Sequence, residues 1–209
     1  SLWAAAAGRP SFGQDAGVLL AEFSKEWPEK RTPYRTEGDQ TWKAYALSLR
    51  NLVAQGAKAV PHLTEALSDK NPQVRALSAR ALGFLAAKES APSAIKLLDD
   101  PLPWVACVAA DTLGQFQDAA GLQALEQAKT RLQHPDVVLH VNKALERKVP
   151  LEEDARELLL KMEAKSLDVA KIGQPAPDFA LKDSDGKEWT VSQFKGRKLV
   201  ALVFIYGDG

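Results

Sequence analysis

The sequence predicts a mainly α-helical protein: an α-solenoid of stacked helix pairs, followed by a short α/β segment. Three observations support this. A pattern recurs about every 31 residues between 57 and 147, the hydrophobic period becomes strand-like at Lys171, and Leu199–Tyr206 is an unbroken apolar run. We expect four parts, namely a flexible N-terminal segment (1–17), helical repeats (18–150), a capping or linking helix (151–170) and the start of an α/β domain (171–209).

Composition excludes several classes of protein. The 209 residues include 27 Lys and Arg and 27 Asp and Glu, so the formal net charge is zero and the basic excess of a nucleic-acid binder is missing. A single cysteine excludes an intrachain disulfide framework and a zinc site built on several thiolates. No apolar run reaches the ~18 residues of a membrane span. We therefore expect no cofactor, no metal, no nucleic acid and no membrane span.

The N-terminus is rich in small residues. It begins Ser1-Leu2-Trp3 and continues with four alanines, without an initial Met. Such a stretch is typical of the end of a secretory signal before its cleavage site. A cloning remnant or an unstructured native terminus is the alternative. The compartment stays open between exported (periplasmic) and cytoplasmic, with the export reading favoured.

Each repeat is predicted to hold a short helix, a turn containing Asp or Pro, and a longer apolar helix. Fixed-period self-similarity of this kind is typical of a solenoid. A third copy is shifted to a period of 32, and a weaker earlier copy lies within residues 39–52. Residues separated by 31 positions are Pro61 and Pro92, Val74 and Val105, Leu82 and Leu113, and Gly83 and Gly114; those separated by 32 are Val105 and Val137, and Leu113 and Leu145.

The turn residues have a physical role. Asp69 and Asp100 stand where a side-chain oxygen can accept hydrogen bonds from the free amides at the start of the second helix, as an N-cap or a loop acceptor. Pro72 and Pro103 fit the first helical turn, where a missing N–H costs nothing. Both features predict that the second helix of a pair begins at these prolines.

The second helices carry an apolar stripe that one pair cannot bury alone, so neighbouring pairs must stack. Gly83 and Gly114, near the helix ends, allow the next layer to approach closely. The stripe is formed by Val74, Leu77, Ala81 and Leu82 in one copy and by Val105, Val108, Thr112 and Leu113 in the next.

Over residues 57–147 this pattern resembles HEAT-like repeats of the short type found in phycobilisome-lyase-like proteins. The best single match is Asp69–Arg75. The position of Arg75 is occupied by Ala106 and Val138 in the next copies, so a continuous Arg–Asp ladder is not expected. The resemblance implies a protein partner on the solenoid surface, and it indicates almost nothing else about function.

The reactive side chains of the repeats are predicted to be structural. Cys107 aligns with Ala76, a small buried position, so we expect a core thiol rather than a nucleophile. The tryptophans Trp42 and Trp104 are expected to be packing anchors. The histidines stand in different repeats or on different faces and do not have metal-ligand spacing; they are His62, His134 and His140.

Residues 151–170 predict a connecting helix. Pro150 and the acidic residues 152–154 suit a helix N-terminus. The apolar stripe is expected to pack on the last repeat as a cap, and it consists of Leu151, Ala155, Leu158, Leu159 and Met162.

The C-terminal segment predicts strands. Ile172–Leu181 reads as an extended first strand, Asp183–Gly186 as a hairpin turn and Lys187–Val191 as the returning strand, followed by a short turn at Ser192–Phe194. The eight apolar residues Leu199–Tyr206 suit a central strand buried on both faces.

Three motifs before that last strand resemble the opening of a redoxin domain, in the alkyl hydroperoxide reductase and thiol-specific antioxidant branch of the thioredoxin-like superfamily. The motifs are Gly173–Phe179, Asp185–Lys187 and Phe194–Gly196. The resemblance implies a redox-active cysteine at the start of the next helix, where free amides and the helix dipole lower the pKa of a thiol. That residue would follow Gly209, so no catalytic residue is expected within residues 1–209.

Three explanations stay open: the chain is a fragment, it is a degenerate redoxin that ends naturally, or a selenocysteine codon was read as a stop. We favour a fragment, because a hairpin and one lone strand cannot form an independent sheet. Leu199–Tyr206 would then pair with missing strands or with another chain. Nearby polar residues are expected to be turn or loop groups, namely Asp178, Asp208, Arg197 and Lys198.

Two functions follow. In the first, the parent protein is a thiol or selenol oxidoreductase acting on disulfides or peroxides, positioned on a partner by the solenoid. In the second, the chain is a non-enzymatic interaction subunit of a larger assembly, with its C-terminal strand donated to a partner's sheet. We expect the first for the parent protein and the second for residues 1–209 alone.

Overall fold

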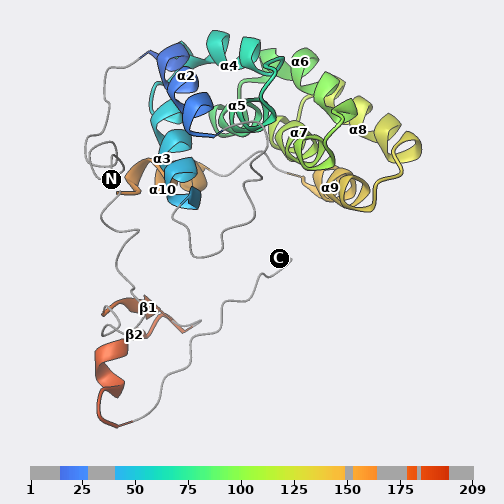
Figure 1. The fold of residues 1–209 in the computed structure, drawn as a ribbon. Coiled ribbons are helices and arrows are strands. Elements are labelled where there is room, and N and C mark those ends of the chain that lie inside the picture. The colour runs from blue at the N-terminus through green and yellow to red at the C-terminus, as the bar shows by residue number, and fades with distance from the viewer. Residues whose placement is uncertain (1–14, 28–40, 149–152, 164–177, 183–184, 198–209) are drawn as a thin grey trace. The chain divides into compact units, whose positions relative to one another are not determined.

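A computed structural model describes residues 15–27, 41–148, 153–163, 178–182 and 185–197. The chain divides into two compact units, Ser1–Ala164 and Lys165–Gly209. The described part of the first unit is helical, whereas that of the second holds a β-hairpin and a short helical turn (Figure 1). The predicted mainly α-helical fold is confirmed. The predicted strand Leu199–Tyr206 lies outside the described residues.

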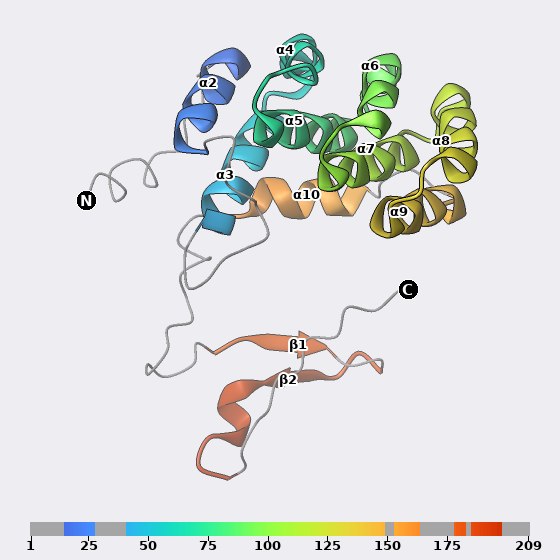
Figure 2. The same cartoon turned by 45° about the vertical axis from the view of Figure 1, so that its right-hand side comes forward.

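The helices of the first unit form two rows. In Figures 1 and 2, α2, α4, α6 and α8 make one row, and α3, α5, α7 and α9 make the other. Within the second row α5 contacts both α3 and α7, and α7 contacts α9, so successive pairs stack as the solenoid prediction required. The bounds are α2 (Ala16–Glu26), α3 (Thr41–Val53), α4 (Val60–Ala66), α5 (Pro72–Leu85), α6 (Ala91–Lys96), α7 (Pro103–Phe116), α8 (Ala119–Arg131) and α9 (Pro135–Glu146).

Single-turn 3₁₀ segments precede or follow the shorter helices. They are Gly56–Ala59 (η1), Lys88–Ser90 (η2) and Leu97–Asp99 (η3). The first helix, α2, begins at Ala16 because the carboxylate of Asp15 accepts a hydrogen bond from the amide of Gly17 at 2.8 Å. Helical structure therefore starts inside the segment that the sequence predicted to be flexible.

The repeated Asp residues act as loop acceptors. Asp69 accepts a hydrogen bond from the amide of Asn71 at 2.7 Å, and Asp100 accepts one from the amide of Leu102 at 3.0 Å. The N-cap of α5 is Asn71 itself, whose side-chain oxygen accepts from the amide of Gln73 at 3.0 Å. The loop-acceptor prediction is confirmed, and each of these helices begins at its proline.

The glycines at the ends of α5 and α7 are sites of close helix contact. A Cβ added to Gly114 would lie 2.8 Å from the Cβ of Ala144 and 2.9 Å from its Cα, closer than packed carbons approach. A Cβ on Gly83 would lie 2.0 Å from the side-chain oxygen of Gln115. Gly114 confirms the prediction that glycine lets the next layer approach, whereas the close contact at Gly83 is with the end of the flexible Gln115 side chain.

One hydrophobic core runs through the array. The stripes predicted on the second helices are buried, and Cys107 on α7 is buried among them, as expected for a core thiol. Trp104 packs against this core from a partly buried position, as predicted for an anchor, while the side chain of Trp42 lies outside the description. At the N-terminal end, the ring of Phe23 stacks on Trp27 with centroids 5.5 Å apart.

The third helix pair departs from the predicted layout. Its first helix, α8, has 13 residues, compared with 7 in α4 and 6 in α6. Both shorter helices follow a 3₁₀ turn and carry a proline in their first turn, whereas α8 is capped by Asp118, which accepts from the amide of Gly121 at 2.9 Å. Part of the first helix of the two earlier pairs is thus replaced by 3₁₀ turns, whereas α8 is one regular helix.

The linking helix α10 (Glu153–Lys161) does not pack where the sequence placed it. It contacts α3, at the opposite end of the array from the last repeat, and a guanidinium nitrogen of Arg50 donates to the carbonyl oxygen of Met162 at 2.6 Å. Leu159 packs against the core, whereas Leu158 is 70% exposed. Adjacent helical residues point in different directions, so the predicted stripe could not bury both leucines.

The second unit contains a short antiparallel hairpin of β1 (Ala180–Lys182) and β2 (Glu188–Thr190), with Leu181 opposite Trp189. Gly186 has a φ of +79°, which agrees with the predicted turn. β1 extends one residue past the predicted end at Leu181, to Lys182. β2 is shorter than the predicted strand Lys187–Val191, and the turn η5 (Val191–Phe194) begins at Val191 rather than at Ser192.

Asp178 lies beside η5, and its carboxylate accepts a hydrogen bond from the amide of Ser192 at 2.9 Å. The hydroxyl and then the amide of Ser192 hold the pKa of Asp178 below its ordinary value. Asp178 is therefore an acceptor in a turn, as the sequence predicted.

Candidate functional site

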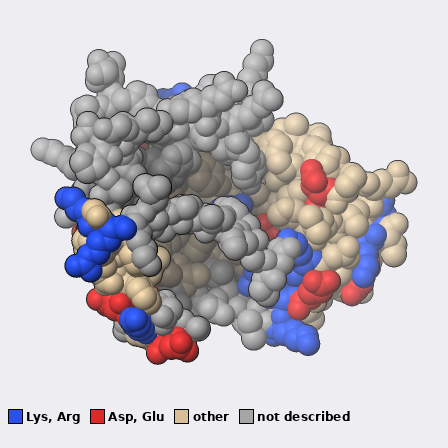
Figure 3. Space-filling view, turned by 90° about the horizontal axis from the view of Figure 1, so that it is seen from below, with Lys and Arg blue, Asp and Glu red and all other residues tan. Residues whose placement is uncertain are grey.

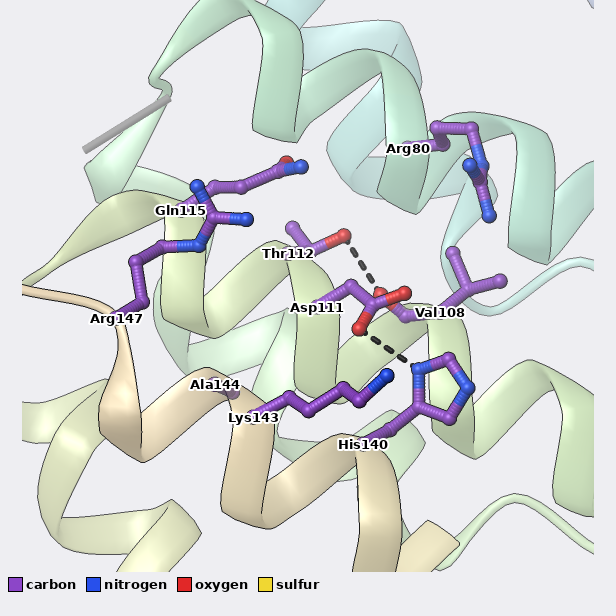
Figure 4. A pocket seen from close by; sticks show the side chains of 9 residues that line it. All are labelled: Arg80, Val108, Asp111, Thr112, Gln115, His140, Lys143, Ala144 and Arg147. Atoms are coloured by element: carbon purple, nitrogen blue, oxygen red, sulfur yellow. Dashed lines mark hydrogen bonds and ion pairs between the residues drawn. The ribbon is translucent and has the colours of Figure 1, made fainter. Parts of the chain in front are cut away.

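A polar hollow lies between α5, α7 and α9 (Figure 4). Its volume is about 220 Å³, and its walls come from the second helices of three successive pairs. Arg80 stands on α5, and Arg147 follows the last residue of α9. The lining residues are Arg80, Val108, Asp111, Thr112, Gln115, His140, Lys143, Ala144 and Arg147. We call this hollow the inner pocket.

The inner pocket is built from equivalent positions of the repeat. Since successive pairs stack in register, residues one repeat apart become neighbours in space. Arg80 and Asp111 are 31 residues apart, which is the period between the first two copies. The pairs separated by the 32-residue period are Val108 and His140, Asp111 and Lys143, Thr112 and Ala144, and Gln115 and Arg147.

Close helix packing fixes the base of the pocket. The hydroxyl of Thr112 lies 3.0 Å from the carbonyl oxygen of Ala79 on α5 and 2.8 Å from that of Val108 on α7, so it joins the two helices. Gln115 extends across Gly83, where a larger residue would collide with it. Apart from Arg147, which follows α9, the side chains that line the pocket project from packed helices rather than from loops.

One hydrogen bond crosses the pocket from α7 to α9. Nδ1 of His140 lies 2.8 Å from Oδ1 of Asp111, as the dashed line in Figure 4 shows. A carboxylate only accepts, so the imidazole Nδ1 carries the proton and donates it. Each side chain is about one-third exposed. The pair fixes the orientation of both groups and engages the carboxylate on the pocket wall.

The remaining charges on the pocket wall are positive. Arg80 is half-buried, and Lys143 and Arg147 are exposed, against the single carboxylate of Asp111. Figure 3 shows the molecule from below the view of Figure 1, with Lys and Arg atoms lying among Asp and Glu atoms on the described surface. A chain of zero net charge thus has a local excess of positive charge at the inner pocket.

The other reactive groups lie apart from one another. His62 stands on α4 and His134 immediately precedes α9, so the three histidines do not converge. Burial, and then the carboxylates of Asp111 and Asp136, raise the pKa of Cys107 to about 11. The thiol is thus protonated at neutral pH, which agrees with a core role and not with a nucleophile.

Two negative findings concern only the part of the chain that the structure describes. Its His, Cys, Asp and Glu side chains form no group of three that could hold a metal ion. None of its helices combines the length and the apolar character that crossing a membrane demands.

Sequence reasoning considered His140 but missed the cations around it. Arg80, Lys143 and Arg147 each stand one or two positions from the buried stripe, where a charged residue ordinarily means a solvated face. The signal that could have found them is the recurrence of charge at equivalent positions, since Arg80, Asp111 and Lys143 follow one another at the repeat period.

Comparison with known proteins supports the prediction of helical repeats. Residues 60–146 match the family described as HEAT repeats. No curated protein and no solved structure matches the chain. The match covers α4 to α9, the same helices that stack in the structure and line the inner pocket. Residues 60–146 of this chain are therefore similar to HEAT repeats, in agreement with the resemblance noted in the sequence.

Proposed function

We propose that the helical array is a protein-interaction module and that its partner binds the face formed by α5, α7 and α9. The observation that carries the proposal is the inner pocket, a polar hollow built by equivalent positions of three stacked repeats. Stacked helix pairs create extended surfaces that repeat proteins use for binding. The similarity of residues 60–146 to HEAT repeats supports the same role.

The two rows of helices differ in what they offer a partner. On α7, polar side chains of Asp111 and Gln115 border the pocket beside a fully buried stripe. On α8, in the other row, the exposed polar residues Gln123 and Gln127 do not line the inner pocket. A partner that needs a shaped polar surface is therefore expected on the row of α5, α7 and α9.

Site-specific photo-crosslinking tests this. A photoreactive phenylalanine would replace Gln115 at the pocket or, as the matched control, Gln127 on α8, in the cells that make the protein. The proposal expects a discrete adduct from position 115, identified by mass spectrometry, and none from position 127. The same adducts from both positions, or adducts from position 127 alone, would contradict it.

We also propose, as a second function, that the C-terminal unit begins a redoxin domain that the helical array positions on its partner. The proposal is supported by the three sequence motifs that resemble the opening of a redoxin domain. The hairpin is compatible with it: Gly186 takes a positive φ in the expected turn, and Asp178, just before β1, accepts from Ser192 in the turn that follows β2. The reaction would be disulfide exchange or peroxide reduction by a thiol or selenol following Gly209.

Peptide mass spectrometry of the native protein, with thiol and selenium mapping, tests the second function. A mass well above 22.7 kDa, with a reactive thiol or selenol peptide after Gly209, would support it. A mass of 22.7 kDa with Cys107 as the sole thiol would exclude it, and residues 1–209 would then be an interaction subunit without redox chemistry.

A further inference from the structure

We propose that the last helix pair binds a second copy of this chain, through an antiparallel contact between α9 of one copy and α9 of the other. The proposal concerns the end of the helical array and is independent of the partner proposed at the inner pocket. It rests on four residues of α9 that we call the end face. They are Val138, Leu139, Asn142 and Glu146.

The repeat shows which side of α9 the end face occupies. At the period of 32, its residues are equivalent to four residues of α7 that are all buried. One of these, Gly114, lies against Ala144 of α9. The end face is therefore the side of α9 on which a further pair would stack, and α9 is the last helix of its row in Figure 2. The equivalent residues of α7 are Ala106, Cys107, Ala110 and Gly114.

The end face is open where the equivalent surface of α7 is covered. Leu139 is 50% exposed, compared with 8% for Cys107. Val138 and Asn142 are half-buried, and Glu146 is exposed. Terminal repeats ordinarily carry a polar outer face, which keeps the array soluble. A valine and a leucine on this face, both larger than the residues they replace, indicate a surface that a partner covers.

A further layer of the same kind does not fit on the end face. Gly114 lets α9 approach α7 so closely that an added Cβ would lie 2.8 Å from the Cβ of Ala144. Glu146 stands at the position of Gly114 one period later, so its side chain would collide with a parallel helix stacked in the same register. The occupant must therefore pack on α9 in another direction, as an antiparallel helix does.

The charges at the two ends of α9 favour a second α9 as that occupant. Asp136 lies in the first turn, Arg147 and Lys148 follow the last residue, and all three are exposed. An antiparallel pair brings the acid of each copy to the basic end of the other, twice by two-fold symmetry, whereas a parallel pair brings like charges together. Exposed ion pairs contribute little energy, so burial of Val138 and Leu139 supplies the affinity and the charges set the direction.

Sedimentation velocity of the full chain over a range of concentrations tests the association. We expect a monomer–dimer equilibrium. Leu139→Glu should raise the dissociation constant of the dimer about tenfold or more, because it places an unpaired carboxylate in the contact. The matched control is Leu158→Glu, since Leu158 is a 70% exposed leucine of α10, which contacts α3, and this change should leave the constant unaltered. Circular dichroism checks that both variants keep their helices.

Charge reversal tests the direction of the contact. Asp136→Lys and Lys148→Glu each put like charges together in the antiparallel pair, so each should weaken association about threefold. The double variant restores opposite charges and should recover the native dissociation constant. In a parallel pair the two changes would show no such rescue. Neither position belongs to the end face, so this test holds even if Leu139→Glu unfolds.

Four outcomes would overturn the proposal. The first is a monomer at every concentration up to about 0.5 mM. The second is a dimer that Leu139→Glu leaves intact, or that Leu158→Glu weakens equally. The third is a double charge variant that associates no better than the single ones. The fourth is a photoreactive phenylalanine at position 139 that crosslinks in cells to another protein and not to a second copy, which would assign the end face to a different partner.

Discussion

The guanidinium of Arg75 on α5 donates two hydrogen bonds to the carboxylate of Asp100, from Nε at 2.7 Å and from Nη2 at 2.9 Å. Its third guanidinium nitrogen donates to the carbonyl oxygen of Asp69 at 2.9 Å. One side chain therefore joins the turn of its own pair to the turn of the next. Asp69 and Asp100 are equivalent by sequence, and only this Arg connects the two positions across the repeat boundary in the described structure.

Removing the ion pair between Arg75 and Asp100 should destabilise the helical array strongly. The side chains of Arg75 and Asp100 are only 12% and 3% exposed, so Arg75→Ala leaves a buried carboxylate without its counter-charge. We expect a loss of about 3 kcal/mol in the free energy of unfolding, measured by urea denaturation with circular dichroism at 222 nm.

The control for Arg75→Ala is a substitution in an exposed arginine–aspartate pair. Arg131 and Asp99 are 52% and 55% exposed, so Arg131→Ala should cost less than about 1 kcal/mol. Equal losses in the two variants would show that burial of the Arg75 pair is not what makes it important.

Gly114→Ala should loosen the contact between α7 and α9. The new methyl group would lie 2.8 Å from the Cβ of Ala144, so the helices must move apart. We expect a loss of about 1–3 kcal/mol in the free energy of unfolding, since overpacking has that cost, and a lower melting temperature by circular dichroism.

A second substitution separates this collision from other effects. Ala144→Gly removes the opposing methyl group at a cost of about 1 kcal/mol from helix propensity. In that background Gly114→Ala should be only partly less harmful than in the native chain, because the Cα of residue 144 would still lie 2.9 Å from the new methyl group. Additive effects of the two changes would argue against the contact.

The thiol of Cys107 should be slow to react. Its pKa is raised to about 11, chiefly by burial, so iodoacetamide should modify the folded protein far more slowly at pH 7 than the urea-unfolded chain. Mass spectrometry follows the reaction. Rapid modification of the folded protein at pH 7 would contradict the buried, neutral thiol.

The same raised pKa predicts a pH dependence of stability. Folding favours the neutral thiol, so the stabilisation is fully present below the unfolded pKa of about 8.5 and is lost as pH rises through about 11. Cys107→Ala, which copies Ala76 of the preceding repeat, should remove this part of the alkaline loss. The difference between the two stability-versus-pH curves isolates the thiol from lysines and tyrosines.

Asp178 should titrate below the ordinary range of aspartates. The Ser192 hydroxyl and amide favour the ionised form, so the turn contact is present above the unfolded pKa and is lost as pH falls through the lowered folded pKa. Carboxyl-detected NMR titration checks the direction. Ser192→Ala keeps the amide but removes the hydroxyl, and the pKa of Asp178 should then rise part of the way back; no change would show that the hydroxyl does not contribute.

Much of the fold could be predicted because repetition makes local patterns reliable. Val74 recurs as Val105 and Gly83 recurs as Gly114, one repeat period later. This recurrence predicted the stacking, since equivalent residues make equivalent contacts in each layer. The core position of Cys107 followed from its alignment with Ala76 by the same reasoning. The site was harder to find, because Arg80, Asp111 and Lys143 differ in type at one equivalent position and the search was for identical residues.

The sequence by itself determined the helical array, its period, its buried stripes and the turn at Gly186, because these depend on contacts between near neighbours and on backbone preferences. Only the tertiary structure decided that α10 contacts α3, that Arg75 reaches Asp100 and that His140 pairs with Asp111. Those relationships join residues 25 or more positions apart. They depend on the angle at which helices stack, and hydrophobic periodicity carries no information about that angle.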